Sequence, residues 1–416
     1  MKKTYIIITA LLVSVVIGLF VAAFILLREP DKTPLETVRD TPLLGGAPED
    51  DLDVSPVLPG VSDDVSVPED DETGAEITPL SFTQLHQLAA LPIAGAAVRR
   101  TEDATFSIRY IEKASGNTYD VAPDGTGKIR ITNTTIPAIY AAVFNAVGSR
   151  MIGQYLDEAN VIKSFAGAVR TAEAGATGKL EGEFLADHIR SFAISPEKNT
   201  VAYTTPLAQG SAVITSSFDG TSRTQIFTHP LSQWQITWPR SDRIALTTAP
   251  SAAAHGFSLL VNTASGRETL FLRNIAGLTT LYAPDTSTIL YAESVAGSIS
   301  TKLHLVASGQ TRLFPVVTLP EKCVWSKRET GTLYCGAPKS IPASSYPDDW
   351  YKGYVTFSDE LWKINIQTGS VSSLADLELL ARGPVDVTKL FLDDDETHLY
   401  FTDKVSETLW SFRLEE

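Results

Sequence analysis

FAISPEKNTVAY (residues 192–203) and LYAPDTSTILYAE (residues 281–293) are two copies of one short pattern. Each copy is an apolar run, a turn of polar residues with Pro or Gly, and a second apolar or aromatic run, which is the pattern of a β-hairpin. Aligned on their turns, six copies follow one another at steps of 50, 43, 45, 43 and 66 residues. The other four are AVFNAVGSRMIGQY from residue 142, ITWPRSDRIALTT from 236, CVWSKRETGTLYCG from 323 and LFLDDDETHLYFT from 390. A strand-rich repeat of roughly 40–50 residues is typical of a β-propeller blade.

A second hairpin accompanies these copies and supplies the other half of each repeat. Five of these second hairpins have a glycine at the turn: Gly125, Gly220, Gly266, Gly309 and Gly369. Glycine adopts the positive φ that tight hairpin turns need, so each repeat reads as four antiparallel strands. A seventh, weaker unit begins at Pro92. We therefore predict an all-β propeller with seven four-stranded blades, and eight blades as the alternative.

The long last step and the two ends of the repeat region predict how the ring is completed. The step of 66 residues contains a stretch rich in Pro, Ser and aromatic residues (341–353), which we interpret as a long loop rather than an eighth blade. The last unit ends at LWSFRL (409–414), which supplies a third strand but no fourth, whereas LSFTQL (80–85) precedes the first blade. We expect this N-terminal strand to pair with the C-terminal blade and close the ring.

The N-terminus carries an apolar run without charge, from Tyr5 to Leu27, with Lys2 and Lys3 before it and Arg28 after it. At about 1.5 Å per residue, such a run is long enough to cross the ~30 Å hydrocarbon core of a membrane. It is also longer than the apolar region of roughly 7–15 residues found in cleaved signal peptides, which remain the alternative. We predict an uncleaved single-pass anchor in the cell membrane, with a cytoplasmic N-terminus and the rest of the chain on the extracytoplasmic side.

Residues 28–80 are rich in Pro, Asp and Glu, with 15 acidic residues, 3 basic residues and no aromatic side chain. Low hydrophobicity combined with high net charge predicts a disordered linker. The expected domains are thus 1–27 (stub and anchor), 28–77 (linker) and 78–416 (propeller). Most of the net charge of −15 lies in the linker. The propeller is close to charge balance, which argues against binding to nucleic acid.

Cys323 and Cys335 are the two cysteines of the chain, and each lies six residues from Glu329 at the centre of one hairpin turn. Equal distances from the turn predict directly opposed cross-strand partners, which are close enough for a disulfide. We predict this disulfide, which persists outside the cytoplasm, and keep two buried free thiols as the alternative. No histidine or second cysteine pair lies at metal-ligand spacing, so we predict no metal and no cofactor.

Two turn phrases, SPEKNTVAY (195–203) and APDTSTILYA (283–292), resemble the SPDG-turn repeats of WD-like propellers such as the periplasmic propeller of the Tol system. Residues 78–416 as a whole also resemble membrane-anchored propeller proteins of candidate-phyla bacteria. The phrases that carry this second resemblance are RYIEKASGNTYDV, ITNTTIP, KCVWS, LYCGAP and YPDDWYKG. The resemblance implies a propeller fold, an extracytoplasmic placement and a binding role, without an established reaction.

SYPDDWYKGY (345–354) is the stretch that most resembles a binding surface. Tyr346, Trp350 and Tyr351 supply rigid aromatic contact area beside Asp348 and Asp349, and aromatic anchors with a polar rim are typical of binding hot spots. The alternative is that Trp350 covers the apolar edge of its own blade.

No catalytic residue is predicted, because the chain has no GxSxG nucleophile motif and no other complete catalytic motif. We therefore predict a non-catalytic binding or scaffold module of the cell envelope, whose partner is an envelope protein or a surface polymer. The alternative is a propeller glycosidase or lyase that uses carboxylates lining the central channel, because such groups come from different repeats and leave no local motif. A purely structural spacer is a third possibility.

Overall fold

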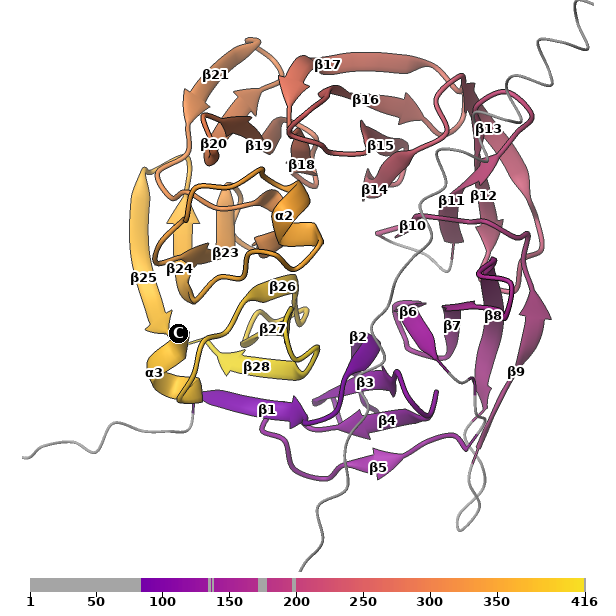
Figure 1. Cartoon of the computed structure of the whole chain (residues 1–416). Helices are drawn as coiled ribbons and strands as arrows, with labels where there is room; N and C mark the ends of the chain where they lie inside the picture. Colours follow the sequence, from indigo (N-terminus) through magenta and orange to yellow (C-terminus); the bar gives the residue numbers. More distant parts are fainter. Residues whose placement is uncertain (1–83, 134–135, 137, 171–177, 197–199, 415–416) are drawn as a thin grey trace, which may run out of the picture. The chain divides into compact units, whose positions relative to one another are not determined.

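The computed structural model describes residues 84–133, 136, 138–170, 178–196 and 200–414. These residues form seven four-stranded antiparallel sheets, which follow one another as the blades of a propeller (Figure 1). The predicted all-β fold with seven blades is confirmed, and the alternative of eight blades is wrong. Within the described ranges, no helix is long and apolar enough to cross a membrane. The predicted anchor (1–27) and linker (28–77) lie outside these ranges.

The blades follow the chain from the second strand onward. Blade 1 is β2 (Ile93–Arg100), β3 (Phe106–Glu112), β4 (Thr118–Val121) and β5 (Ile129–Arg130), and blade 2 is β6 (Ile139–Phe144), β7 (Arg150–Leu156), β8 (Ile162–Arg170) and β9 (Lys179–Phe184). Blade 3 is β10 (Phe192–Ile194), β11 (Thr200–Pro206), β12 (Ser211–Ser217) and β13 (Thr224–His229), and blade 4 is β14 (Trp234–Arg240), β15 (Arg243–Thr248), β16 (His255–Asn262) and β17 (Glu268–Ala276). Blade 5 is β18 (Thr279–Tyr282), β19 (Thr288–Val295), β20 (Ser298–Leu305) and β21 (Gln310–Leu313), and blade 6 is β22 (Cys323–Trp325), β23 (Thr332–Pro338), β24 (Asp359–Asn365) and β25 (Ser370–Asp376). Blade 7 is β26 (Val387–Leu392), β27 (His398–Asp403) and β28 (Leu409–Arg413), completed by β1 (Leu85–Ala89). In the described ranges, three short helices lie between strands: η1 (Pro320–Lys322), α2 (Asp348–Tyr351) and α3 (Leu377–Ala381).

The N-terminal strand closes the ring, as the strand count predicted. β1 pairs antiparallel with β28, with Leu85 opposite Phe412 and His86 opposite Ser411 (Figure 1). The strand extends further along the chain than predicted, to Ala89; of the predicted segment 80–85, Leu85 is paired and residues 80–83 lie outside the described ranges. The reason is packing: Leu88 and Ala89 are buried in the apolar cluster between blades 7 and 1.

Each interface between neighbouring blades has its own apolar cluster, so both faces of every sheet are covered. Between blades 3 and 4, for example, Val213 packs with Trp234 and Leu246. Blades 1 and 2 approach especially closely at Gly95, where an added Cβ would lie 2.0 Å from the carbonyl oxygen of Ala142. A glycine is therefore needed at this position for steric reasons.

Candidate functional site: the cross-blade loop and the central cavity

The first candidate site is the segment between β23 and β24, residues 339–358, which we call the cross-blade loop. It is a long loop within blade 6, as the sequence predicted, and it contains α2. In Figure 1, α2 lies on the inner side of blade 6. The loop forms hydrogen bonds with two other blades. The Ser344 amide donates to the carbonyl of Gly297 in blade 5 (2.9 Å), and the Asp348 carboxylate accepts from the Ala252 amide in blade 4 (2.6 Å). The loop therefore extends from blade 6 to blades 5 and 4.

The aromatic residues of this loop do not form one exposed patch. Tyr346 and Trp350 are 1% and 2% exposed and pack with Phe357 against Ile299 of blade 5. Tyr351 is 39% exposed. Its hydroxyl contacts the Glu321 carboxylate and accepts from Gln235 Nε2 in blade 4 at 3.1 Å. Each of these aromatic residues is held by contacts within the propeller.

Asp349 holds the turn that begins α2. Its carboxylate accepts from the Ser345 amide at 2.9 Å and contacts the Ser344 hydroxyl, and these hydrogen bonds lower the pKa of Asp349. Of the predicted binding residues, Tyr346 and Trp350 are therefore inside the protein, whereas Asp348, Asp349 and Tyr351 keep partial exposure. Their role in binding a partner stays a prediction.

A fully buried ionic group lies beneath Trp350. Lys322 Nζ lies 2.7 Å from Asp359 Oδ2 and 2.5 Å from Asp386 Oδ1, and all three side chains are 0% exposed. The Trp350 indole N–H donates to Asp386 Oδ2 at 2.9 Å, and the Phe357 amide donates to the same oxygen at 3.1 Å. These residues come from the connection between blades 5 and 6, the cross-blade loop, the start of β24 and the connection between blades 6 and 7. Because the group has no access to solvent, its role is to hold these segments together.

Burial raises the pKa of Asp359 to about 6, and this effect exceeds the opposing influence of Lys322. The raised pKa follows from the cost of burying a carboxylate in a medium of low polarity. Asp359 Oδ2 accepts from the Val387 amide at 2.6 Å, whereas Oδ1 is buried and has no hydrogen-bond partner among the described residues. A perturbed carboxyl group in this position is a folding element, because no substrate can reach it.

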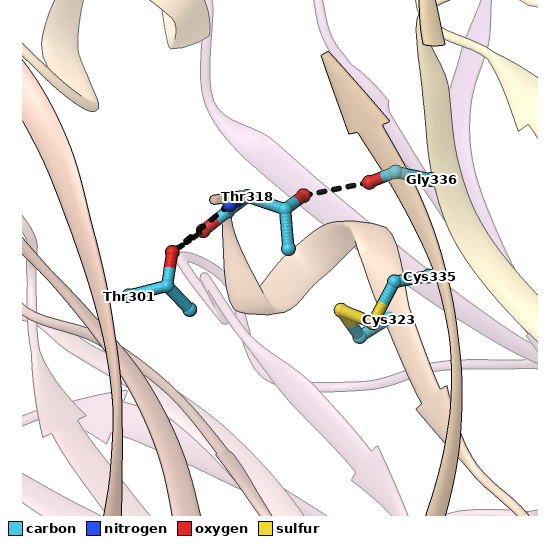
Figure 2. Close-up of a disulfide and its surroundings, with 5 residues drawn as sticks. All are labelled: Thr301, Thr318, Cys323, Cys335 and Gly336. Atoms are coloured by element: carbon cyan, nitrogen blue, oxygen red, sulfur yellow. Dashed lines mark hydrogen bonds between the residues drawn. A yellow bond between two sulfur atoms is a disulfide. The ribbon is translucent and has the colours of Figure 1, made fainter. Parts of the chain in front are cut away.

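The disulfide belongs to the same blade. Cys323 and Cys335 are directly opposed on β22 and β23, as the equal distances from the turn predicted, and their Sγ atoms are 2.12 Å apart (Figure 2). Beside them, Thr318 joins blades 5 and 6: its amide donates to Thr301 Oγ1 (2.9 Å) and its hydroxyl donates to the Gly336 carbonyl (2.6 Å) (Figure 2). The bridge therefore lies at a tightly held interface between blades.

The second candidate site is a cavity of about 700 Å³ at the inner strands of blades 1, 2, 3 and 7. Its wall is mostly small and apolar, and includes residues 94–98 of β2 and residues 141–146 at β6. Three cations line it, Arg190, Lys327 and Lys389. None of the described lining residues is Asp or Glu. The lining of the cavity thus combines positively charged side chains with a mostly apolar wall.

Two of the three cations have no ion-pair partner within the described part of the chain. Lys327 pairs with Asp394 at 3.2 Å, but neither Arg190 nor Lys389 forms an ion pair there. Lys389 is exposed within the cavity and has a φ of 52°, at a register shift between β26 and β27. A lysine in the left-handed region is unusual, and such conformations are enriched at functional sites. Loss of water around the Lys389 ammonium group and the nearby positive charge of Lys113 lower the pKa of Lys389, whereas the negative charge of Glu407 raises it.

Sequence reasoning missed these cations because they lie far apart from one another in the chain. Lys389 is the charged residue in VTKLFL, an otherwise uncharged inner strand, and Arg190 lies two residues before Phe192, where the inner strand of blade 3 begins. A charged residue in or next to an inner strand was the sequence signal that could have indicated these cavity residues. Within the described ranges, no group of three or more His, Cys, Asp or Glu residues could hold a metal ion.

Comparisons with known proteins add fold similarity alone. No protein-family model and no curated protein matches the sequence. Among solved structures, the chain is similar to oligogalacturonate lyase from Vibrio parahaemolyticus, with a TM-score of 0.47 and 9% identity over 80% of this chain and 91% of that chain. It is also similar to a protein described as TolB from Agrobacterium tumefaciens (TM-score 0.37, 12% identity, 53% and 80% covered). A third similar structure is the tricorn protease (TM-score 0.35, 14% identity, 71% and 27% covered). At these values, the similarities carry no information about activity.

Proposed function

We propose that this protein is a membrane-anchored binding module that holds an envelope protein or a surface polymer on the extracytoplasmic side of the membrane. The observation that carries the proposal is the central cavity. Its volume of about 700 Å³ is in the range of ligand sites, roughly 300–1,000 Å³. A mostly apolar wall with a few polar or charged groups is also typical of such sites.

The placement rests on two further observations. The uncharged run from Tyr5 to Leu27 has the length and composition of a membrane anchor. The Cys323–Cys335 disulfide supports an oxidising environment, since disulfides are rare in cytosolic proteins. Both observations favour a propeller outside the cytoplasm.

The glycosidase form of the enzyme alternative requires a pair of carboxyl groups about 5–9.5 Å apart beside the scissile bond. The described lining of the cavity offers Lys and Arg in place of Asp and Glu. Asp359 and Asp386 form a carboxyl pair elsewhere, but both are fully buried. Binding therefore accounts for the cavity better than glycoside hydrolysis does.

A cavity-filling variant tests the proposal. Full-length protein in detergent, wild type and Ala141→Trp, is used to capture polymers and proteins from an envelope extract, and the captured species are identified. Ala141 is a half-buried residue of the cavity wall. We expect the variant to lose the captured species while its melting temperature is unchanged. Capture that is equal for both proteins would contradict the proposed site, and shortening of a bound polymer would favour the enzyme alternative.

A further inference from the structure

Within the described part of the chain, the central cavity combines an apolar wall with two cations that form no ion pair, Arg190 and Lys389, and this combination restricts the chemistry of its ligand. Arg190 comes from blade 3, Lys327 from blade 6 and Lys389 from blade 7, so the positive charges are distributed around the cavity. Cations that lack an anionic partner next to an apolar wall attract negative charge, because each charge is less well solvated there than in bulk water. Distributed charges match a ligand that carries several anions along its length.

Of the three cations, Lys327 alone has an acidic ion-pair partner among the described residues. Glu407 is the carboxylate close to Lys389, but it forms an ion pair with Lys113. Asp394 pairs with Lys327, whose side chain is 64% exposed. Among the described residues, none forms an ion pair with Arg190 or Lys389, so these two cations can meet an anion from solution.

The uncharged part of the wall matches ring-shaped groups. Phe192 and Phe391 line the cavity and are half-buried, so part of each ring faces it. The wall also has alanines at positions 94, 96, 97, 141 and 142. Pyranose rings have apolar C–H faces that pack on aromatic side chains, and uronate pyranoses also carry a carboxylate that can pair with a cation.

Taken together, we infer that the central cavity binds a segment of an acidic polysaccharide, with uronate carboxylates held by Arg190 and Lys389. This inference rests on the proposed function and specifies its ligand class. The strained backbone of Lys389 is consistent with selection for the charge at this position, since a glycine would adopt a φ of 52° at lower cost.

The test measures binding of three defined probes to full-length protein in detergent: a hexasaccharide of uronic acid, a neutral glucose hexasaccharide and a hexaglutamate peptide. We expect the uronate hexasaccharide to bind and to bind more weakly as salt concentration rises, because the contacts are charge-assisted. Lys389→Gln and Arg190→Gln should each weaken it about tenfold, the typical loss for a charged hydrogen bond. Lys389→Arg should retain most of the binding.

Two further variants control for folding and for net charge. Lys389→Gly suits the positive φ, so it should keep the wild-type melting temperature and still lose affinity. Arg267→Gln, on the exposed hairpin turn between β16 and β17, removes one charge away from the cavity and should bind like the wild type.

The outcomes separate the inference from the proposed function. Failure of the uronate probe to bind, or wild-type affinity in both Lys389→Gln and Arg190→Gln, would overturn the inference. Tighter binding of hexaglutamate than of uronate would show that the ligand class is wrong. If the neutral hexasaccharide binds and Ala141→Trp abolishes this binding, the cavity is a ligand site but not an anion site. The proposed site itself fails if Ala141→Trp affects no bound species.

Discussion

Trp350 Nε1 lies 2.9 Å from Asp386 Oδ2, so a side chain of the cross-blade loop in blade 6 binds a carboxylate at the start of blade 7. Trp350 is 2% exposed and Asp386 is 0% exposed. On the other side of Asp386, Lys322 Nζ approaches Oδ1 at 2.5 Å. The contact therefore fixes the loop to the body of the propeller through a buried, charge-assisted hydrogen bond.

Trp350→Ala is expected to lower the free energy of unfolding by about 3–5 kcal/mol, because it empties a buried aromatic site and leaves Asp386 with fewer donors. Urea denaturation followed by circular dichroism measures the change. Tyr354→Ala is the control, since Tyr354 belongs to the same loop but is 79% exposed, and it should shift stability by less than about 0.5 kcal/mol. Equal effects for the two variants would contradict the structural role of Trp350.

Asp359→Asn should change how stability depends on pH. The pKa of Asp359 is raised from 3.8 to about 6 in the folded protein. Between these values the folded state holds a proton that the unfolded state releases, so wild-type stability falls as pH rises through this window. Asparagine has no such proton. Between pH 4 and pH 7, the free energy of unfolding of the variant should rise relative to that of the wild type by on the order of 2 kcal/mol. Urea unfolding at each pH measures this difference. A stability difference that does not change with pH would argue against the raised pKa.

Removal of the Cys323–Cys335 bridge should destabilise the protein by roughly 3 kcal/mol, the value expected for a short closed loop. The two cysteines are 12 residues apart in sequence. The measurement compares the wild type with the double variant Cys323→Ala, Cys335→Ala by thermal unfolding, with and without reductant. Reductant should lower the melting temperature of the wild type alone. Mass analysis that finds two free thiols in the isolated native protein would refute the bridge.

Gly95→Ala should destabilise the interface between blades 1 and 2 by about 1–3 kcal/mol, the usual cost of overpacking. The new Cβ would lie 2.0 Å from the Ala142 carbonyl oxygen, so the inner strands must move apart. Gly383→Ala is the matched control, because nothing lies within 4 Å of its added Cβ and its φ is not positive. Thermal unfolding of the two variants distinguishes a steric effect at Gly95 from a general effect of replacing glycine.

Protease added to intact cells should remove the propeller if the chain is anchored by Tyr5–Leu27 with an external C-terminal part. Immunoblotting against the propeller, with a cytoplasmic protein as the control for cell integrity, measures this. Cleavage is expected in the segment rich in Asp and Pro that precedes the propeller, because exposed polar segments are the usual sites of proteolysis. A propeller that stays intact until the cells are lysed would reverse the proposed orientation.

The sequence by itself was sufficient for the architecture. The hairpin pattern, its step of 43–50 residues and the missing fourth strand at the C-terminus predicted seven blades closed by an N-terminal strand. The opposed register of Cys323 and Cys335 was also predictable. These features depend on local periodicity and turn residues, which residues near in sequence determine. The closing strand extends to Ala89, beyond the predicted segment 80–85, because an outermost strand carries a weak apolar pattern and the packing of Leu88 and Ala89 sets where it ends.

Only the tertiary structure decided where the cross-blade loop lies and which side chains face the cavity. An aromatic loop has the same sequence pattern whether it projects or packs, and the contacts of Trp350 with Asp386 and of Asp348 with Ala252 join residues far apart in the chain. Likewise, Lys389 lines the cavity at a shift in strand register. Contacts of this kind depend on the relative positions of whole blades. Those positions follow from burial at all seven apolar interfaces between blades, so no local sequence pattern predicts the contacts.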